Sequence, residues 1–183
     1  MDNLDDLDFL PLIQRIRNTL LSANIDEVVS VPIMKCFIKL CNANVSCYRA
    51  NMKILHIRKT EPENYKEIAS SEWGARSVGE IRVKQKALIN TVLAHHFDGT
   101  EGDITTWTSD DIVYSVGEML DRISIEYIKE IYFTNNHEPE KLLLSKKWAS
   151  RVHLYLIQKL TEVKTKGYYK SVNEQRTYDL SGI

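Results

Sequence analysis

Apolar residues recur at intervals of three and four over most of the 183-residue chain. Between Pro32 and about Lys59, for example, Phe37, Leu40 and Ile54 follow this spacing, which is typical of a helix. Seven glycines and four prolines are few for this length, and this favours long helices over many turns. No segment alternates as a strand does. We therefore expect an all-α fold, a single helical bundle.

About six helices are expected in this bundle, and one long loop, "DGTEGDITTWTSD", lies between the fourth and the fifth. Residues 1–164 form the bundle domain, and residues 165–183 form a C-terminal tail that is partly ordered or flexible. The expected helices are Phe9–Ser22, Pro32–Lys59, a shorter one after Pro62, Val78–Phe97, Val116–Phe133 and Glu138–Lys164.

A short pattern, Ser-Val-x-Glu, occurs three times, at Ser77–Glu80, Ser115–Glu118 and Ser171–Glu174. A serine followed three residues later by a glutamate is the capping box. The serine oxygen accepts a backbone N–H of the first turn, and the glutamate accepts the N–H of the serine. The segments that follow the first two copies barely match each other. The repeat therefore indicates helix starts and not a repeated functional motif.

The charge balance gives the chain no general attraction to nucleic acid or to an anionic membrane, because its net charge is −1. The tail "KTKGYYKS" mixes lysines with tyrosines, which suits single-stranded nucleic acid, but a flexible basic end explains it as well. No apolar run approaches the roughly 20 residues of a membrane span. The N-terminus is acidic where a signal peptide is basic. We expect a cytoplasmic protein without nucleic-acid or membrane partners.

No motif of a known catalytic class occurs, since GxSxG, GxGxxG, P-loop and HExxH sequences are all lacking. Cys36, Cys41 and Cys47 lack the spacing and the fourth ligand of a zinc site, and we expect reduced thiols. The pair Glu118 and Asp121 resembles half of the magnesium-binding set of helical nucleotide pyrophosphohydrolases, but the rest of that set does not occur. We predict neither a metal nor a cofactor, and leave open whether the chain is an enzyme.

One carboxylate stands out on the predicted helix Val116–Phe133. At about 100° per residue, Asp121 falls between Ile128 and Tyr132 in the apolar arc, with Ser124 nearby. A buried carboxylate needs a cation or several hydrogen-bond donors. Outside this arc, the wheel predicts a solvated face formed by Glu118, Arg122, Glu126 and Lys129, with an ion pair between Glu118 and Arg122.

Polar residues of neighbouring helices are candidate partners for this carboxylate. Asn90 falls on the apolar side of its helix, while His153 lies at the edge of the apolar stripe of the last helix and Arg151 lies off it. Arg76 and Arg176 are further cations that can pair with Asp121. The group is either a structural network that fixes helix register or a pocket between helices.

The stretch "SVGEMLDRISIEYIKEIYF" resembles the signature of a bacterial family of helical proteins catalogued only as a domain of unknown function. Looser likenesses involve Asn90, and Arg176 with Tyr178 in the tail. The resemblance implies an all-helical bundle and brings no established reaction. The matched positions are Ser115, Gly117, Asp121, Arg122, Ser124, Ile125, Lys129 and Tyr132.

Two classes of function remain open. The favoured one is an interaction or assembly protein, whose broad apolar faces bind a protein partner or further copies of the chain. The alternative is a protein or enzyme that binds a nucleotide or a sugar phosphate in a polar pocket around Asp121. The candidate ligand-binding residues are Asn90, Asp121, Arg122, Ser124, Lys129, Arg151, His153 and Arg176.

Overall fold

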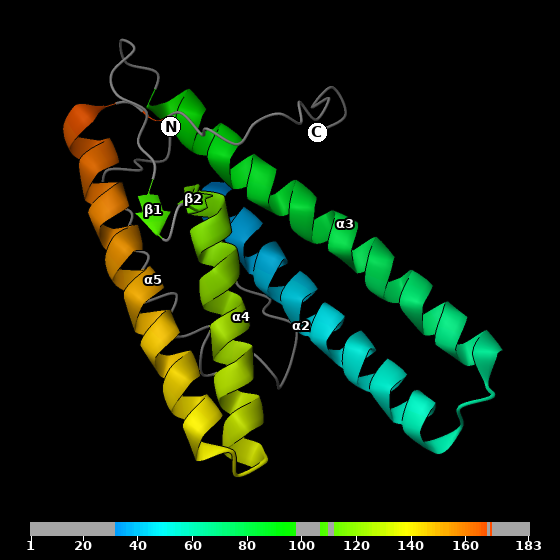
Figure 1. The fold of residues 1–183 in the computed structure, drawn as a ribbon. Coiled ribbons are helices and arrows are strands. Elements are labelled where there is room, and N and C mark those ends of the chain that lie inside the picture. The colour runs from blue at the N-terminus through cyan, green and yellow to red at the C-terminus, as the bar shows by residue number, and fades with distance from the viewer. Residues whose placement is uncertain (1–31, 98–106, 110–111, 168, 170–183) are drawn as a thin grey trace.

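The computed structural model describes residues 32–97, 107–109, 112–167 and 169, and most of these lie in four α-helices. The helices pair in sequence order into two hairpins, and α4 lies between α5 and the first hairpin (Figure 1). The prediction of a helical bundle is confirmed. The helices are α2 (Pro32–Thr60), α3 (Tyr65–His96), α4 (Val116–Asn135) and α5 (Pro139–Lys166).

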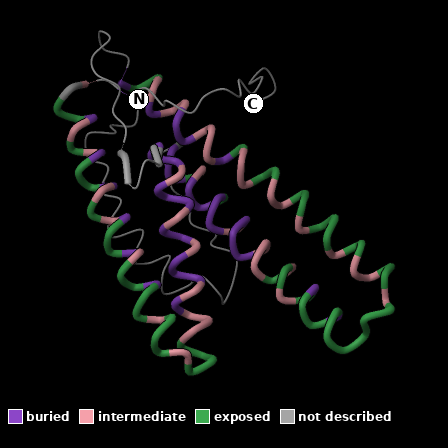
Figure 2. Tube along the Cα trace, in the orientation of Figure 1, coloured by how far each residue is buried: buried purple, intermediate pink, exposed green. Residues whose placement is uncertain are grey.

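The core lies where the first half of α2, the second half of α3 and most of α4 meet, and buried residues concentrate there in Figure 2. Helix α4 contacts α2, α3 and α5. This position explains why α4 is apolar over most of its circumference, since three neighbours cover it. Among its buried side chains are Met119, Leu120, Ile123, Tyr127 and Ile128.

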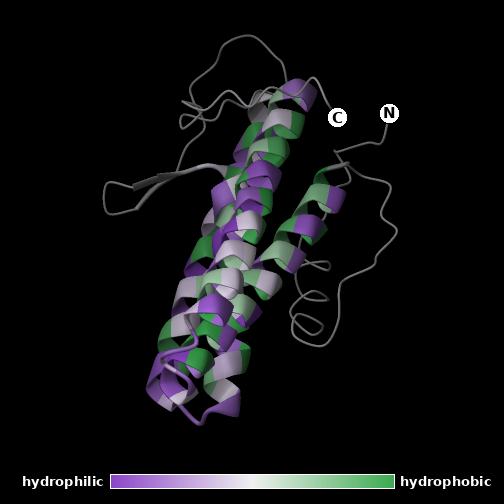
Figure 3. Cartoon of the chain, turned by 90° about the vertical axis from the view of Figure 1, so that its right-hand side faces the viewer, coloured by the Kyte–Doolittle hydropathy of each residue, from purple (hydrophilic) through white to green (hydrophobic). Residues whose placement is uncertain are grey.

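Local signals set the helix ends. Pro62 lies in the turn between α2 and α3, which is hydrophilic (Figure 3), and the Asn64 side chain accepts the N–H of Glu67 at 3.3 Å to begin α3. Pro139 occupies the first turn of α5, where its missing N–H is not needed. Gly167 ends α5 with φ of 65°, a left-handed conformation that glycine adopts without steric strain.

The helix start predicted at Ser77 is wrong, because α3 runs without a break from Tyr65 to His96. The shorter helix predicted after Pro62 and the helix predicted at Val78–Phe97 are parts of the single helix α3. Serine and glycine inside a helix cost at most about 1 kcal/mol each, and α3 packs along α2 over this stretch. The capping box at Ser115 is confirmed: its oxygen accepts the Glu118 N–H, and Glu118 accepts the Ser115 N–H. The third copy, at Ser171, lies outside the described residues.

A short antiparallel pair of strands, β1 (Trp107–Ser109) and β2 (Ile112–Tyr114), lies in and beside the predicted long loop, with Trp107 opposite Tyr114. The prediction of no strands is therefore wrong at this point. The described residues contain four of the expected helices after the merger in α3, and the predicted helix at Phe9–Ser22 falls outside them. None of the described helices has the length and apolar character needed to cross a membrane.

Candidate functional site

Asp121 faces inward from α4, as the wheel predicts, and its side chain is only 7% exposed. Arg82 of α3 binds it with two parallel bonds. Arg82 Nε donates to Oδ1 at 2.8 Å and Nη2 donates to Oδ2 at 2.7 Å. Hydrogen bonding to Asp121 raises the pKa of Arg82. Two bonds from one planar guanidinium fix both the position and the orientation of the carboxylate.

Further donors complete this cluster. Asn44 of α2 donates to Asp121 Oδ1 at 2.9 Å and to Ser124 Oγ at 2.6 Å, and the Lys86 ammonium lies 3.7 Å from Oδ2. Ser124 Oγ donates to the backbone oxygen of Asp121 at 2.8 Å. Burial, with the nearby charge of Asp121, raises the pKa of the Cys41 thiol, which keeps it protonated. The cluster therefore joins three helices through satisfied polar groups, as a structural network does.

Of the cations that sequence reasoning offered to Asp121, the two that the structure describes, Arg76 and Arg151, do not bind it. Arg76 is exposed on α3, Arg176 lies outside the described residues, and Arg151 is exposed on α5, 5.6 Å from the ring of Trp148. The partners it missed are Arg82 and Lys86. Their spacing was a usable signal: both residues lie at four-residue intervals before Asn90 and therefore share one face of α3.

Asn90 belongs to a second polar cluster, at the start of α4. Its Nδ2 donates to Ser115 Oγ at 3.0 Å, and its Oδ1 accepts the Gly117 N–H at 2.9 Å and the Tyr169 hydroxyl at 3.0 Å. That hydroxyl also accepts the Val116 N–H at 3.1 Å. These bonds satisfy backbone N–H groups that a helix start leaves without intrahelical partners.

A glycine lets α3 and α4 approach each other closely beside this cluster. A Cβ atom at Gly117 would lie 2.5 Å from the backbone oxygen of Lys86 and 3.1 Å from Asn90 Oδ1. No larger residue fits without moving one helix. The clusters around Asn90 and Asp121 are therefore parts of one close α3–α4 contact.

The predicted solvated face of α4 is wrong at Glu126, which is 1% exposed. Its Oε1 binds Arg122 Nε at 2.9 Å and Lys129 Nζ at 3.1 Å, and its Oε2 accepts the Ser145 hydroxyl at 2.7 Å. Arg122 thus pairs with Glu126 and not with Glu118, whose carboxylate caps the helix. Helix α5 packs over this side of α4, which a wheel of α4 alone does not show.

A cavity of about 320 Å³ opens beside Glu126, between α4 and α5. It contains two of the predicted ligand-binding residues, Arg122 and Lys129, although the prediction placed the pocket around Asp121. The cavity is lined by Arg122, Glu126, Lys129, Phe133, Lys141, Leu144, Ser145 and Trp148.

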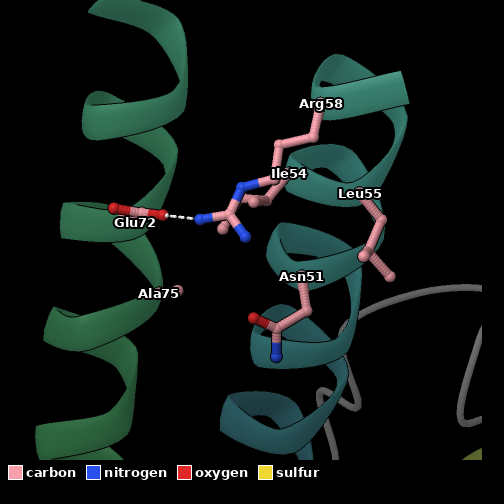
Figure 4. A pocket seen from close by; sticks show the side chains of 6 residues that line it. All are labelled: Asn51, Ile54, Leu55, Arg58, Glu72 and Ala75. Atoms are coloured by element: carbon pink, nitrogen blue, oxygen red, sulfur yellow. Dashed lines mark hydrogen bonds and ion pairs between the residues drawn. The ribbon is translucent and has the colours of Figure 1, made fainter. Parts of the chain in front are cut away.

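A second cavity, of about 440 Å³, lies between α2 and α3 (Figure 4). Arg58 of α2 reaches across to Glu72 of α3, and the two form an ion pair of 2.5 Å. Both side chains are about half exposed, and such pairs contribute little to stability. The remaining lining residues are Asn51, Ile54, Leu55 and Ala75.

His153 lies half-buried on α5, and burial lowers its pKa. Its Nε2 is enclosed and has no hydrogen-bond partner in the described part of the chain. The predicted site residues that the structure describes thus separate into several places and do not form one pocket. Among the described residues, no group of three or more His, Cys, Asp or Glu side chains is arranged to hold a metal ion.

The outer face of α5 carries a second apolar stripe. At about 100° per residue, the exposed side chains of Leu143, Leu154 and Ile157 lie within about 60° of one another. The buried residues Val152 and Leu156 lie on the opposite side of the helix, against α4. The exposed residues Lys147 and Ser150 lie between Leu143 and Leu154 on this side, so polar residues interrupt the stripe, and the described helices cover only the opposite side of α5.

Comparisons with protein-family models, with curated proteins and with solved structures find no match. The resemblance of the segment Ser115–Tyr132 to a bacterial helical family therefore stays a prediction. The functional argument depends on the geometry of this chain alone.

Proposed function

We propose that the protein is an interaction protein whose outer α5 face binds an acidic amphipathic helix of a partner protein. The observation that supports this proposal is the exposed stripe of Leu143, Leu154 and Ile157, opposite the face that packs on α4. Their exposed fractions are 71%, 55% and 40%. Leu154 and Ile157 are three residues apart, as the anchors of a helix-to-helix contact are, and Leu143 lies on the same side three turns before Leu154.

The docking face is on α5 and not on α4. The sequence argument for an interaction protein relied on the broad apolar circumference of α4, but three neighbouring helices cover that circumference. The stripe from Leu143 to Ile157 extends over roughly 21 Å, at 1.5 Å per residue. This length accommodates about four turns of a partner helix. The surface buried by such a contact is at the low end of the range for specific protein–protein interfaces.

The positive charges in and beside the stripe favour an acidic partner. Lys147 is exposed within the stripe and Lys146 beside it, and Glu140 is the exposed carboxylate near its first turn. Arg151 is also exposed there, with its guanidinium 5.6 Å from the Trp148 ring. Acidic residues flanking the apolar positions of a partner helix would face these cations and be steered toward them. A second copy of this chain would bring the same cations and be repelled at Lys146 and Lys147.

The proposal is tested with two labelled peptides of about 20 residues that share leucines at heptad spacing. One peptide carries glutamates at the flanking positions, and the other carries lysines. Fluorescence anisotropy of the full chain should show binding of the acidic peptide only. Leu154→Glu should weaken binding at least tenfold, because it places a carboxylate in the stripe, facing acidic residues of the peptide.

A matched control is Leu55→Glu, which alters an equally exposed leucine on α2. It should leave the affinity for the acidic peptide unchanged. Equal affinity of the folded protein for both peptides, or for neither, would overturn the proposal. Light scattering that shows a dimer lost in Leu154→Glu would identify a second copy as the occupant and contradict the acidic partner.

A further inference from the structure

The cavity between α4 and α5 has the charge of an anion site. Arg122, Lys129 and Lys141 line it, and Glu126 is the carboxylate among its lining residues. Lys141 also forms an ion pair with Glu138, so three cations against two carboxylates leave a charge of +1 around about 320 Å³. A phosphate monoester carries −1.5 to −2 near pH 7 and has three strong acceptor oxygens, one for each of the three cations, whereas a carboxylate has two.

Glu126 acts as a positioning residue for two of these cations. Its Oε1 holds both Arg122 Nε and Lys129 Nζ, while Ser145 occupies Oε2. A guanidinium has five N–H donors and an ammonium has three, and Glu126 takes one from each. The buried carboxylate therefore holds two cationic groups side by side at the cavity, which reduces the entropy lost when they bind an anion.

The other walls are apolar and aromatic. The Arg122 guanidinium lies 5.9 Å from the centre of the Trp148 ring, and the Lys141 ammonium lies 5.9 Å from that of Phe133. Leu144 adds an aliphatic wall. A volume of about 320 Å³ is at the low end of ligand pockets, which limits the occupant to one ring system with a short polar substituent.

We infer that this cavity binds a phosphate monoester joined to a planar ring, a ligand of the size of a mononucleotide. The phosphate contacts Arg122, Lys129 and Lys141, and the ring lies against Trp148. This site is separate from the docking face on the outside of α5. The two proposals therefore stand or fall independently.

Calorimetric titration of the full chain tests the inference with four probes: adenosine 5′-monophosphate, adenosine, ribose 5-phosphate and inorganic phosphate. The monophosphate should bind with a Kd below about 1 mM. The other three should each bind at least tenfold more weakly, because each lacks the ring or the phosphate. A folded protein that binds none of them, or binds adenosine as well as its monophosphate, overturns the inference.

Two lysines on the same helix provide a matched pair of variants. Lys141→Gln removes a cation that lines the cavity, and it should weaken monophosphate binding about tenfold, the effect of one charged hydrogen bond. Lys146→Gln makes the same change on an exposed lysine outside the cavity lining and should have no such effect. Equal weakening in both variants would indicate general charge attraction and contradict a site.

The same pair separates the two proposals. Lys146→Gln should weaken binding of the acidic peptide, whereas Lys141→Gln should leave it unchanged. If the unchanged protein binds the monophosphate but not the acidic peptide, the docking proposal alone is contradicted. If the unchanged protein binds the acidic peptide but not the monophosphate, the cavity proposal alone is contradicted.

Discussion

Replacing Asp121 with asparagine tests whether the buried ion pair stabilises the fold. The substitution keeps the shape of the side chain but removes its charge. It also places an NH₂ group where an oxygen accepts bonds from Arg82 or from Asn44. The positive charge of Arg82 then loses its partner, and one donor faces another.

The expected loss of stability is about 2–3 kcal/mol. Breaking a buried ion pair costs about 3–5 kcal/mol when the remaining charge stays in the interior. The Arg82 side chain, however, is 33% exposed and that of Lys86 is 24% exposed. Both can turn partly toward water, so the lower range applies, close to the value for a charged hydrogen bond.

Urea unfolding followed by circular dichroism measures this loss as a shift of the midpoint at an unchanged slope. In a thermal scan the melting temperature should fall by about 5–10 °C. The matched control is Glu72→Gln, which makes the same chemical change in an ion pair that is about half exposed. It should cost less than about 1 kcal/mol. Equal and small effects of the two substitutions would show that water, and not Arg82, solvates Asp121.

Two further predictions concern helix contact and protonation. Gly117→Ala should destabilise the fold by about 1–3 kcal/mol, because its Cβ would lie 2.5 Å from the Lys86 oxygen. The control Gly79→Ala should be neutral or stabilising, because a Cβ at Gly79 would have no atom within 4 Å. Urea unfolding in which Gly117→Ala is as stable as Gly79→Ala would refute the close approach of the helices. Burial lowers the pKa of His153 below 6.5, so the unfolded state takes up its proton first as pH falls. Stability from this residue is thus present above pH 6.5 and lost below it. Urea midpoints at pH 7.5 and 5.5 should differ less for His153→Gln than for the unchanged protein, and an equal difference would contradict a buried neutral imidazole.

The inward position of Asp121 was predictable, because a lone carboxylate in an apolar arc is visible on the wheel of one helix. Its partners were not. They depend on the register between two helices, which the wheel of one helix does not give. The helix predicted at Val78–Phe97 already places Arg82, Lys86 and Asn90 on one face, but only the structure shows that this face meets α4.

Glu126 shows why a wheel fails on a helix with several neighbours. Three charged residues near it suggest a solvated face, but α5 covers the side of that face on which Glu126 lies and leaves Arg122 and Lys129 partly exposed. Burial here follows from the path of another helix. The strands at Trp107–Ser109 and Ile112–Tyr114 were missed for a different reason, since three residues are too few to show a period.

Tyr169 makes the start of α4 depend on a residue synthesised much later. Its hydroxyl accepts the Val116 N–H across 53 positions of sequence, and its own N–H donates to the Phe97 oxygen at 3.1 Å. At roughly 5–20 residues per second of translation, Val116 is made about 3–10 s before Tyr169. During synthesis on the ribosome, the first amide of the central helix therefore remains without this partner until Tyr169 has been made and has emerged.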